Sequence, residues 1–252
     1  MDTLLTDQVA IVTGGASGLG RATVELFVEQ GAKVVIADID VEKGRALASG
    51  LGTAAVFKQT NVADAEQLQA LIDFTVEYFG GLNVMINNAG ISGAVHNRFL
   101  DDDLADFDQV IGVNLFAVMK GSQCAARYMA EHGGGAIINT TSIAGIKPGL
   151  PLISYRAAKS AVIHVTKSIA RDLGEYSIRV NCIALGHIPA GQTFYDMSEM
   201  IKRVQPLQRQ GSPIDFANAA LYFASELSAQ VTGQVLSVDG GSSLCGSPLQ
   251  VT

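Results

Sequence analysis

Short runs of apolar, mostly β-branched residues alternate along the chain with longer segments of helical periodicity. The first run, residues 9–13, reads Val-Ala-Ile-Val-Thr, which is typical of a strand buried on both faces of a sheet. Further runs of this kind occupy residues 33–37, 54–59, 84–86, 136–141, 179–184 and 235–238. The intervening patterns predict helices over residues 21–30, 41–51, 64–79, 104–129, 198–204 and 214–227, and one that contains Tyr155 and continues to about Gly174. This alternation predicts an α/β fold with a parallel sheet.

The composition fits a well-buried globular core. Of the 252 residues 48% are hydrophobic and only 16% are charged, and 27 glycines suit tight turns between strands and helices. The length fits one large domain or two small ones. Because no internal repeat, linker or low-complexity stretch interrupts the pattern, we expect a single domain over residues 1–252.

The charge and the cysteines restrict the partners. A net charge of -7 without a basic stripe argues against a nucleic-acid partner. Cys124, Cys182 and Cys245 are odd in number and far apart, so we expect reduced thiols and no metal site. The chain starts without the basic region of a signal peptide, and no apolar run is long enough to span a bilayer. These features predict a cytoplasmic protein with no membrane partner.

Candidate chemistry centres on Tyr155 and Lys159, with Ser142 thirteen residues before the tyrosine. Residues four apart share one face of a helix, so the phenol and the ammonium can meet. A nearby cation lowers a tyrosine pKa from about 10, and a fall of ~3 units, enough for a general base at neutral pH, takes roughly 4 kcal/mol. These groups suit proton transfer to or from an alcohol or carbonyl oxygen, although such pairs also occur on solvated helices.

The glycines of residues 14–20 follow the first strand and open a helix, which is the context of a dinucleotide-binding turn. Gly14, Gly18 and Gly20 allow a tight turn and a close approach to a pyrophosphate. Asp38 ends the second strand, where a carboxylate can accept both ribose hydroxyls and repel a 2′-phosphate. The pattern therefore favours NAD over NADP. The alternatives are a purely structural turn and a role for Asp38 as a helix cap, which Asp40 can serve equally well.

Three asparagines lie at informative positions. Asn61 can bond an adenine edge or cap the next helix, and both interpretations stay open. The small residues after Asn88 at the end of the fourth strand fit close passage beside a ligand. Asn114 falls inside an apolar helix, where asparagine is disfavoured, so it is expected to make a specific bond of structural or functional use.

Together these features resemble the short-chain dehydrogenase/reductase family over essentially the whole chain. The matching pieces are Thr13 to Gly20, Asp38, Asn61-Val62, Asn87 to Gly90, Asn114, Ser142, Tyr155 with Lys159, and Asp239 to Gly241. The resemblance implies a three-layer, Rossmann-like, doubly wound seven-stranded parallel sheet of order 3-2-1-4-5-6-7. It implies cofactor contacts at Gly14, Ala16, Ser17, Gly18, Leu19, Gly20, Asp38, Ile39, Asn61, Val62, Asn88, Ala89, Gly90, Tyr155, Lys159, Gly186 and Ile188.

The resemblance also implies catalytic roles. Tyr155 is expected to be the acid/base, Ser142 to polarise the reacting oxygen, Lys159 to lower the tyrosine pKa and hold the nicotinamide ribose, and Asn114 to keep a water in a proton path. The family commonly forms tetramers through its two long middle helices and its last strand, which predicts a homotetramer or a homodimer. On such a surface Val165, Ile169 and His164 can lie, although a core position is equally open for His164.

One segment departs from the family pattern. After the sixth strand the family usually has Pro-Gly, an apolar residue and a threonine, whereas this chain has Leu185 in place of the proline and Ala190 in place of the threonine. Thr193 can substitute for the missing hydroxyl. His187 lies beside the expected site as a solvent-exposed or a catalytic side chain. The irregular residues 185–212 are expected to form a substrate-binding loop with a short helix at 198–204.

The sequence therefore predicts an NAD-dependent oxidoreductase that interconverts a hydrophobic secondary alcohol and its ketone. The expected substrate walls are mostly apolar: Ser92, Gly93, Ala94, Ile143, Ala144, Leu150, Phe194, Tyr195 and Met197. One alternative is a 3-oxoacyl-thioester reductase, for which Lys202, Arg203 and Arg209 are a thin docking patch for an acidic carrier protein. Another is a non-catalytic dinucleotide-binding sensor or scaffold, favoured only by the altered segment after Ala184.

Overall fold

The computed structural model describes residues 3–149, 151–189 and 197–245. Seven strands form one parallel sheet in the order β3-β2-β1-β4-β5-β6-β7. The strands are β1 (Val9–Thr13), β2 (Lys33–Asp38), β3 (Ala55–Gln59), β4 (Val84–Asn87), β5 (Gly135–Ser142), β6 (Ile178–Leu185) and β7 (Val235–Val238). Both the α/β class and the strand order are confirmed.

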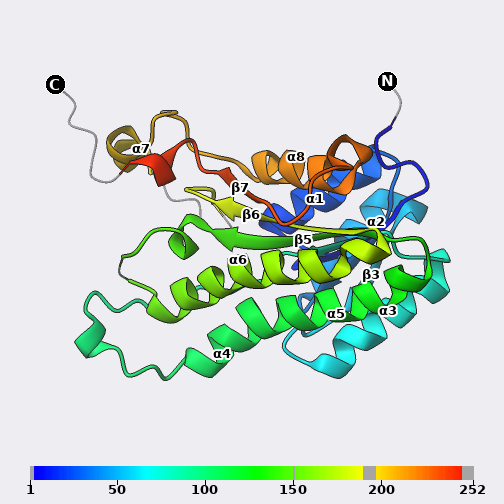
Figure 1. The fold of residues 1–252 in the computed structure, drawn as a ribbon, viewed down its shortest axis with the longest axis horizontal. Coiled ribbons are helices and arrows are strands. Elements are labelled where there is room, and N and C mark those ends of the chain that lie inside the picture. Colours follow the sequence, from blue (N-terminus) through cyan, green and yellow to red (C-terminus); the bar gives the residue numbers. More distant parts are fainter. Residues whose placement is uncertain (1–2, 150, 190–196, 246–252) are drawn as a thin grey trace.

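Helices cover both faces of the sheet (Figure 1). They are α1 (Gly18–Glu29), α2 (Val41–Leu51), α3 (Ala65–Phe79), α4 (Phe107–Ile111), α5 (Ala117–Glu131), α6 (Ile153–Leu173), α7 (Ser198–Val204) and α8 (Pro213–Ala224). Helices α1, α2 and α8 share one apolar cluster with the sheet, and α3, α5 and α6 share the other. The result is a three-layer structure whose strands are buried on both sides.

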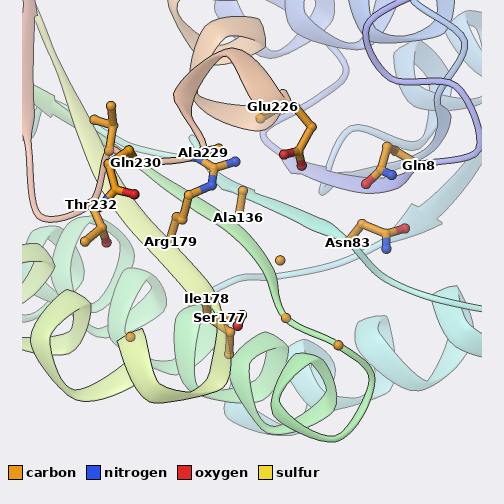
Figure 2. Close-up of a pocket in the computed structure, with 16 residues that line it drawn as sticks. Gln8, Asn83, Ala136, Ser177, Ile178, Arg179, Glu226, Ala229, Gln230 and Thr232 are labelled. Atoms are coloured by element: carbon orange, nitrogen blue, oxygen red, sulfur yellow. The ribbon is translucent and has the colours of Figure 1, made fainter.

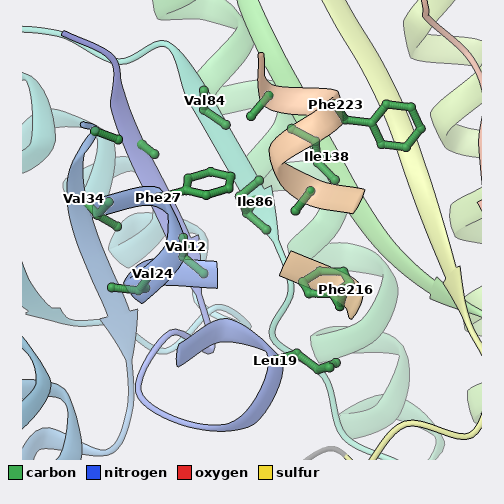
Figure 3. Packing of buried hydrophobic residues seen from close by; sticks show 14 of the residues in the cluster. Val12, Leu19, Val24, Phe27, Val34, Val84, Ile86, Ile138, Phe216 and Phe223 are labelled. Atoms are coloured by element: carbon green, nitrogen blue, oxygen red, sulfur yellow. The ribbon is translucent and has the colours of Figure 1, made fainter. Parts of the chain in front are cut away.

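Two hydrophobic cores hold the layers together. In the first, Phe27 of α1 and Phe216 and Phe223 of α8 pack over the central strands (Figure 3). All three rings are at most 2% exposed. Burying a phenylalanine of this kind stabilises a fold by roughly 1.5–3 kcal/mol. The continuous apolar runs of the strands are explained by this double burial, because neither face of the sheet is open to water.

The predicted helix over residues 104–129 is interrupted. Leu104 has a φ of 57°, a left-handed conformation that a helix cannot include, so α4 begins only at Phe107. The wider π-helical segment η3 (Gly112–Phe116) then separates α4 from α5, and it contains Asn114. Such π-bulges occur often at functional sites.

Leu185 belongs to β6 rather than to the expected loop. It pairs with Ser142 of β5 and with Val238 of β7, and its side chain is 8% exposed. The connection therefore begins at Gly186, and the expected short helix within it is confirmed as α7. Among the described residues there is no helix that combines the length and the hydrophobicity of a membrane span.

Candidate active site

The carboxyl ends of the central strands bring the predicted residues to one edge of the sheet. Strands β1, β2, β4 and β5 end in Thr13, Asp38, Asn87 and Ser142. Because all strands run parallel, these ends meet at the same side, where open α/β sheets bind their ligands. The glycine-rich turn after Thr13 therefore lies on the same side of the molecule as Ser142.

Ser142 is the last residue of β5 and Tyr155 lies in the first turn of α6. The Ser142 Oγ accepts from the backbone N–H of Ala144 at 3.1 Å and lies 3.4 Å from the carbonyl oxygen of Leu185. The Ser142 side chain is also a hydrogen-bonding neighbour of Tyr155, and this interaction acts to lower the tyrosine pKa. The structure thus brings together the two hydroxyl side chains that the sequence singled out.

The Tyr155 pKa does not follow the expectation drawn from the sequence. Burial raises it above its ordinary value of 10.0, while the bond to Ser142 and the charge of Arg156 oppose that rise. The expected fall is wrong for this state of the protein. The Lys159 Nζ lies 5.6 Å from the centre of the Tyr155 ring, and removal of the phenol from water outweighs any benefit from that cation.

Lys159 is 3% exposed, and its Nζ donates to the carbonyl oxygen of Thr140 at 2.9 Å. Burial lowers the Lys159 pKa to about 8. In the described part of the chain no carboxylate forms an ion pair with it. A lysine in this setting can exchange its proton near neutral pH, because its charge is held by a carbonyl dipole rather than by an anion.

Asn114 is fully buried and faces the same region. Its Nδ2 donates to the carbonyl oxygens of Ile91 (2.8 Å) and Val110 (3.0 Å), and its Oδ1 accepts from the Ile91 N–H at 3.3 Å. A methyl group on Gly90 would lie 2.8 Å from the Asn114 Oδ1 and 3.6 Å from the Lys159 Nζ. The expected specific bond of Asn114 is therefore present, and it holds the segment after β4 beside Lys159.

The glycine-rich turn forms a cradle that side chains would fill. Gly14 and Gly18 have φ values of 62° and 52°. A Cβ on Gly20 would lie 2.0 Å from the carbonyl oxygen of Gly14, so that position excludes any side chain. Ser17 precedes α1 without capping it, and the first turn of α1 carries no acidic residue. With Ala16 and Leu19, these residues leave the helix N-terminus suited to a phosphate group.

Asp38 is tied to this turn. Its Oδ2 accepts from the Ala16 N–H and its Oδ1 from the Asp40 N–H, each at 3.0 Å. The N-cap of α2 is Asp40, which accepts from the Lys43 N–H, so the capping alternative for Asp38 is wrong. The carboxylate keeps further lone pairs for ribose hydroxyls. Ile39, at 68% exposure, presents apolar surface beside it, where an adenine ring can lie.

Asn61 is exposed, and its Oδ1 accepts from the Ala63 N–H at 3.1 Å. The N-cap of α3 is Asp64, which accepts from two backbone N–H groups, so the capping alternative for Asn61 is also wrong. Val62 is 8% exposed and packs in the second core. The adenine contact of Asn61 stays a prediction.

The segment from Asn88 to Gly90 is fastened to β1 by a residue that sequence reasoning did not single out. The Thr13 Oγ1 accepts from the N–H groups of Asn88 (2.9 Å) and Ala89 (3.1 Å) and donates to the Ile86 carbonyl oxygen. The Asn88 Nδ2 donates to the Thr13 and Gly14 carbonyl oxygens. Its buried Oδ1 has no partner among the described residues. The signal in the sequence that could have identified Thr13 is a hydroxyl residue at the end of the first strand.

In the segment that departs from the family pattern, a backbone hydrogen bond joins the chain to the end of β7. The Gly186 N–H donates to the Val238 carbonyl oxygen at 3.1 Å, and a side chain on Gly186 would collide with Asp239. Ile188 packs against the first core, and His187 is half-buried with its Nδ1 3.4 Å from the Ser242 Oγ. The solvent-exposed alternative for His187 is therefore wrong. Leu150, Ala190, Thr193, Phe194 and Tyr195 lie outside the described residues.

A hollow of about 530 Å³ opens at the amino ends of β5 and β6, at the opposite end of these strands from Ser142 and Leu185 (Figure 2). Its central cation, Arg179, donates to the Phe223 carbonyl oxygen at 2.7 Å, to the Ser228 Oγ at 2.6 Å and to the Ser225 carbonyl oxygen at 3.4 Å. These bonds satisfy carbonyl groups at the end of α8. The geometry therefore explains Arg179 as a cap for that helix.

Comparison with known proteins shows the family to which the chain belongs. A family model described as enoyl-(acyl carrier protein) reductase matches residues 14–243. (+)-Borneol dehydrogenase 2 of Salvia officinalis is 37% identical, and the match covers 98% of this chain and 93% of that one. Secoisolariciresinol dehydrogenase of Forsythia intermedia is 35% identical with the same coverage, and zerumbone synthase of Zingiber zerumbet is 35% identical over 98% of both chains. The chain belongs to the short-chain dehydrogenase/reductase family of oxidoreductases, which bind nicotinamide dinucleotides.

Proposed function

We propose that the protein is an NAD-dependent oxidoreductase that interconverts a hydrophobic secondary alcohol and its ketone. The observation that carries the proposal is that Ser142, Tyr155 and the buried Lys159 lie together, with the Lys159 Nζ 5.6 Å from the centre of the Tyr155 ring. These groups lie at the sheet edge that also carries the glycine cradle and Asp38. A protein that only binds a dinucleotide has no need of two neighbouring hydroxyls and a buried ammonium, so this arrangement argues against a sensor or scaffold.

Each residue has a defined task in the proposed reaction. Ser142 donates a hydrogen bond to the substrate oxygen, and Tyr155 takes the proton from that oxygen in the oxidative direction and returns it in the reductive one. Lys159 stabilises the phenolate and binds the nicotinamide ribose, and Asn114 holds the adjoining backbone beside a proton path that ends at Lys159. The bound nicotinamide supplies the hydride acceptor.

The preference for NAD rests on the carboxylate of Asp38. We expect Asp38→Asn to reduce the preference for NAD over NADP by about tenfold or more, because the neutral amide no longer repels a 2′-phosphate and accepts the ribose hydroxyls less well. The measurement is the ratio of kcat/KM values with the two cofactors. Asp40→Asn is the matched control, since it removes the same charge two residues away. An unchanged ratio in Asp38→Asn would remove the basis for the assignment.

Apolar residues on the segments after β4 and β5 support a hydrophobic substrate. Ile143 and Ala144 directly follow Ser142, while Ile146 and Val95 are 44% and 65% exposed. Ser92, Gly93, Ala94 and Met197 complete the proposed wall within the described residues. The relatives named above are, by their names, enzymes of borneol, secoisolariciresinol and zerumbone. We therefore propose a bulky apolar alcohol or ketone, cyclic or terpenoid in character.

Reduced-nicotinamide formation by the purified protein tests the whole proposal. The panel comprises cyclic, terpenoid and steroid secondary alcohols beside small charged hydroxy acids, each with NAD and with NADP. We expect turnover of apolar alcohols with NAD. Turnover confined to the charged hydroxy acids would refute the substrate class, and no oxidation of any compound with either cofactor would refute the reaction.

The carrier-protein alternative gains little from its docking patch. Lys202 pairs with Glu199 and Arg209 pairs with Asp215, each at 2.8 Å. Two of the three proposed cations are therefore already neutralised by neighbouring carboxylates. Such a patch attracts an acidic carrier weakly.

We further propose that the protein is a cytoplasmic homotetramer or homodimer that associates through α5 and α6. A groove of about 820 Å³ runs between these helices and includes Val165 and Ile169. Phe116 and Met119 also line the groove and are 41% and 48% exposed, so they add large apolar side chains to this surface. His164 is exposed, so the core alternative for it is wrong. Sedimentation equilibrium measures the assembly, and a 26.4 kDa species at all concentrations would contradict it.

A further inference from the structure

The side chain of Arg156, the residue after Tyr155, lies against the chain segment that leads into α6. Its Nε donates to the Pro151 carbonyl oxygen at 2.9 Å and its Nη1 to the Lys147 carbonyl oxygen at 3.1 Å. Gly149 lies against the guanidinium, because a Cβ there would meet three of its atoms at 3.2–3.3 Å. In the described ranges of the chain no carboxylate pairs with Arg156.

The described residues of the segment that leads into α6, 147–149 and 151–152, include several that cannot form regular backbone bonds or that have an unfavourable backbone conformation. Pro148 and Pro151 lack an N–H, and Leu152 has a φ of 69°, which is disfavoured for a residue with a side chain. Leu152 is the N-cap position of α6, and no side chain caps the helix there. A backbone of this kind does not hold one conformation by local preference, so external bonds must select it.

The position of this segment places its contacts with Arg156 beside the proposed substrate site. It connects the turn after Ser142 to the helix that carries Tyr155, and it follows the apolar residues Ile143 and Ala144 of the proposed substrate wall. At its start the Lys147 Nζ donates to the carbonyl oxygens of Ser242 (3.0 Å) and Cys245. The segment is therefore fastened on one side to the C-terminal part of the chain and on the other to α6.

We propose that Arg156 is a positioning residue of the proposed reaction: its guanidinium clamps the backbone at Lys147, Gly149 and Pro151 and so sets the wall of the substrate site between Ser142 and Tyr155. The inference rests on the proposed function. Arginine suits this task because its planar fork can donate to two carbonyl groups at once, which the single ammonium of lysine does less well. The charge of Arg156 also opposes the rise of the Tyr155 pKa that burial causes, which agrees with its place beside the site.

Two variants separate geometry from charge. Arg156→Lys keeps the charge and loses the fork, while Arg156→Gln loses both. We expect both to raise the KM for the alcohol about tenfold, with kcat changed less than about threefold and the NAD dissociation constant unchanged. Arg171→Gln, an exposed arginine of the same helix, is the matched control and should resemble the wild type. Full recovery of KM in Arg156→Lys, or no change in Arg156→Gln, would overturn the clamp.

A second measurement needs no substrate and separates this proposal from the proposed function. Amide hydrogen exchange of a peptide covering residues 143–155 should be at least about tenfold faster in Arg156→Gln and Arg156→Lys than in the wild type and Arg171→Gln. Faster exchange in an enzyme that turns over no alcohol would refute the function and keep the clamp. Unchanged exchange in both variants would refute the clamp whatever the enzyme turns over.

Discussion

Replacing Tyr155 with phenylalanine should lower kcat for the alcohol by about 10²–10⁴-fold, the contribution of a positioned acid/base group. The ring keeps its place in the first turn of α6, and only the hydroxyl that bonds Ser142 is lost. We therefore expect the dissociation constant of NAD to change less than about threefold. Assays of reduced-nicotinamide formation measure kcat. Fluorescence quenching or calorimetric titration with NAD measures the dissociation constant.

Tyr78→Phe is the matched control, because it removes a phenol hydroxyl from a side chain that is 56% exposed on α3. It should keep full activity. A Tyr155→Phe enzyme with more than about a tenth of the wild-type kcat would show that another group moves the proton. Loss of NAD binding in the same variant would instead show that the hydroxyl acts on the cofactor site.

Lys159→Met should make the protein more stable at pH 7 while it impairs turnover. The buried ammonium has a pKa of about 8 in the folded protein against its ordinary value of 10.5, so folding opposes its charge. A difference of that size corresponds to about 3 kcal/mol at pH values below 8. Loss of the bond to the Thr140 carbonyl oxygen removes about 1 kcal/mol of that gain. We expect a net increase of about 2 kcal/mol in the free energy of unfolding.

The pH dependence gives the sign of the effect. Between about pH 8 and 10.5 the unfolded chain binds the Lys159 proton and the folded one does not, so the stability of the wild type should rise with pH across that range. The methionine variant lacks this rise of about 3 kcal/mol, so the two stabilities should cross, and the wild type should be the more stable protein by about 1 kcal/mol near pH 10.5. Denaturant titrations from pH 6 to 10.5 measure both. Lys167→Met, which replaces an exposed lysine on the same helix, is the control. If Lys159→Met is less stable than the wild type at pH 7, burial of the Lys159 charge does not destabilise the folded protein.

Much of the fold follows from local patterns. The apolar runs locate all seven strands to within about two residues, because strands buried on both faces must be apolar throughout. The helices at 41–51 and 198–204 match in full. The helix over 104–129 was harder to predict, since periodicity does not reveal the left-handed Leu104 or the π-helical segment at Asn114. The π-helical segment packs against α6, and its Asn114 bonds Ile91 in the segment after β4, which are contacts between parts of the chain that periodicity does not relate.

The candidate site shows the same division between local and tertiary effects. Spacing alone places Tyr155 and Lys159 on one face of α6, and the end of a strand places Ser142. The pKa direction of Tyr155 could not be obtained from that spacing. It depends on how far the phenol is removed from water, and burial is set by the whole surrounding structure.

The amino-acid pattern was sufficient to establish the α/β class, the glycine cradle, the acidic residue after the second strand, and the serine, tyrosine and lysine of the candidate site. Each of these depends on residue types at fixed separations along one element or across one turn. The packed chain was needed to show that Asp38 bonds the turn at Ala16, that Leu185 extends β6 into the core, and that Arg156 folds back onto the carbonyl groups of Lys147 and Pro151. These outcomes depend on backbone groups brought together from distant or irregular segments, and their hydrogen-bonding needs cannot be read from the pattern of side chains.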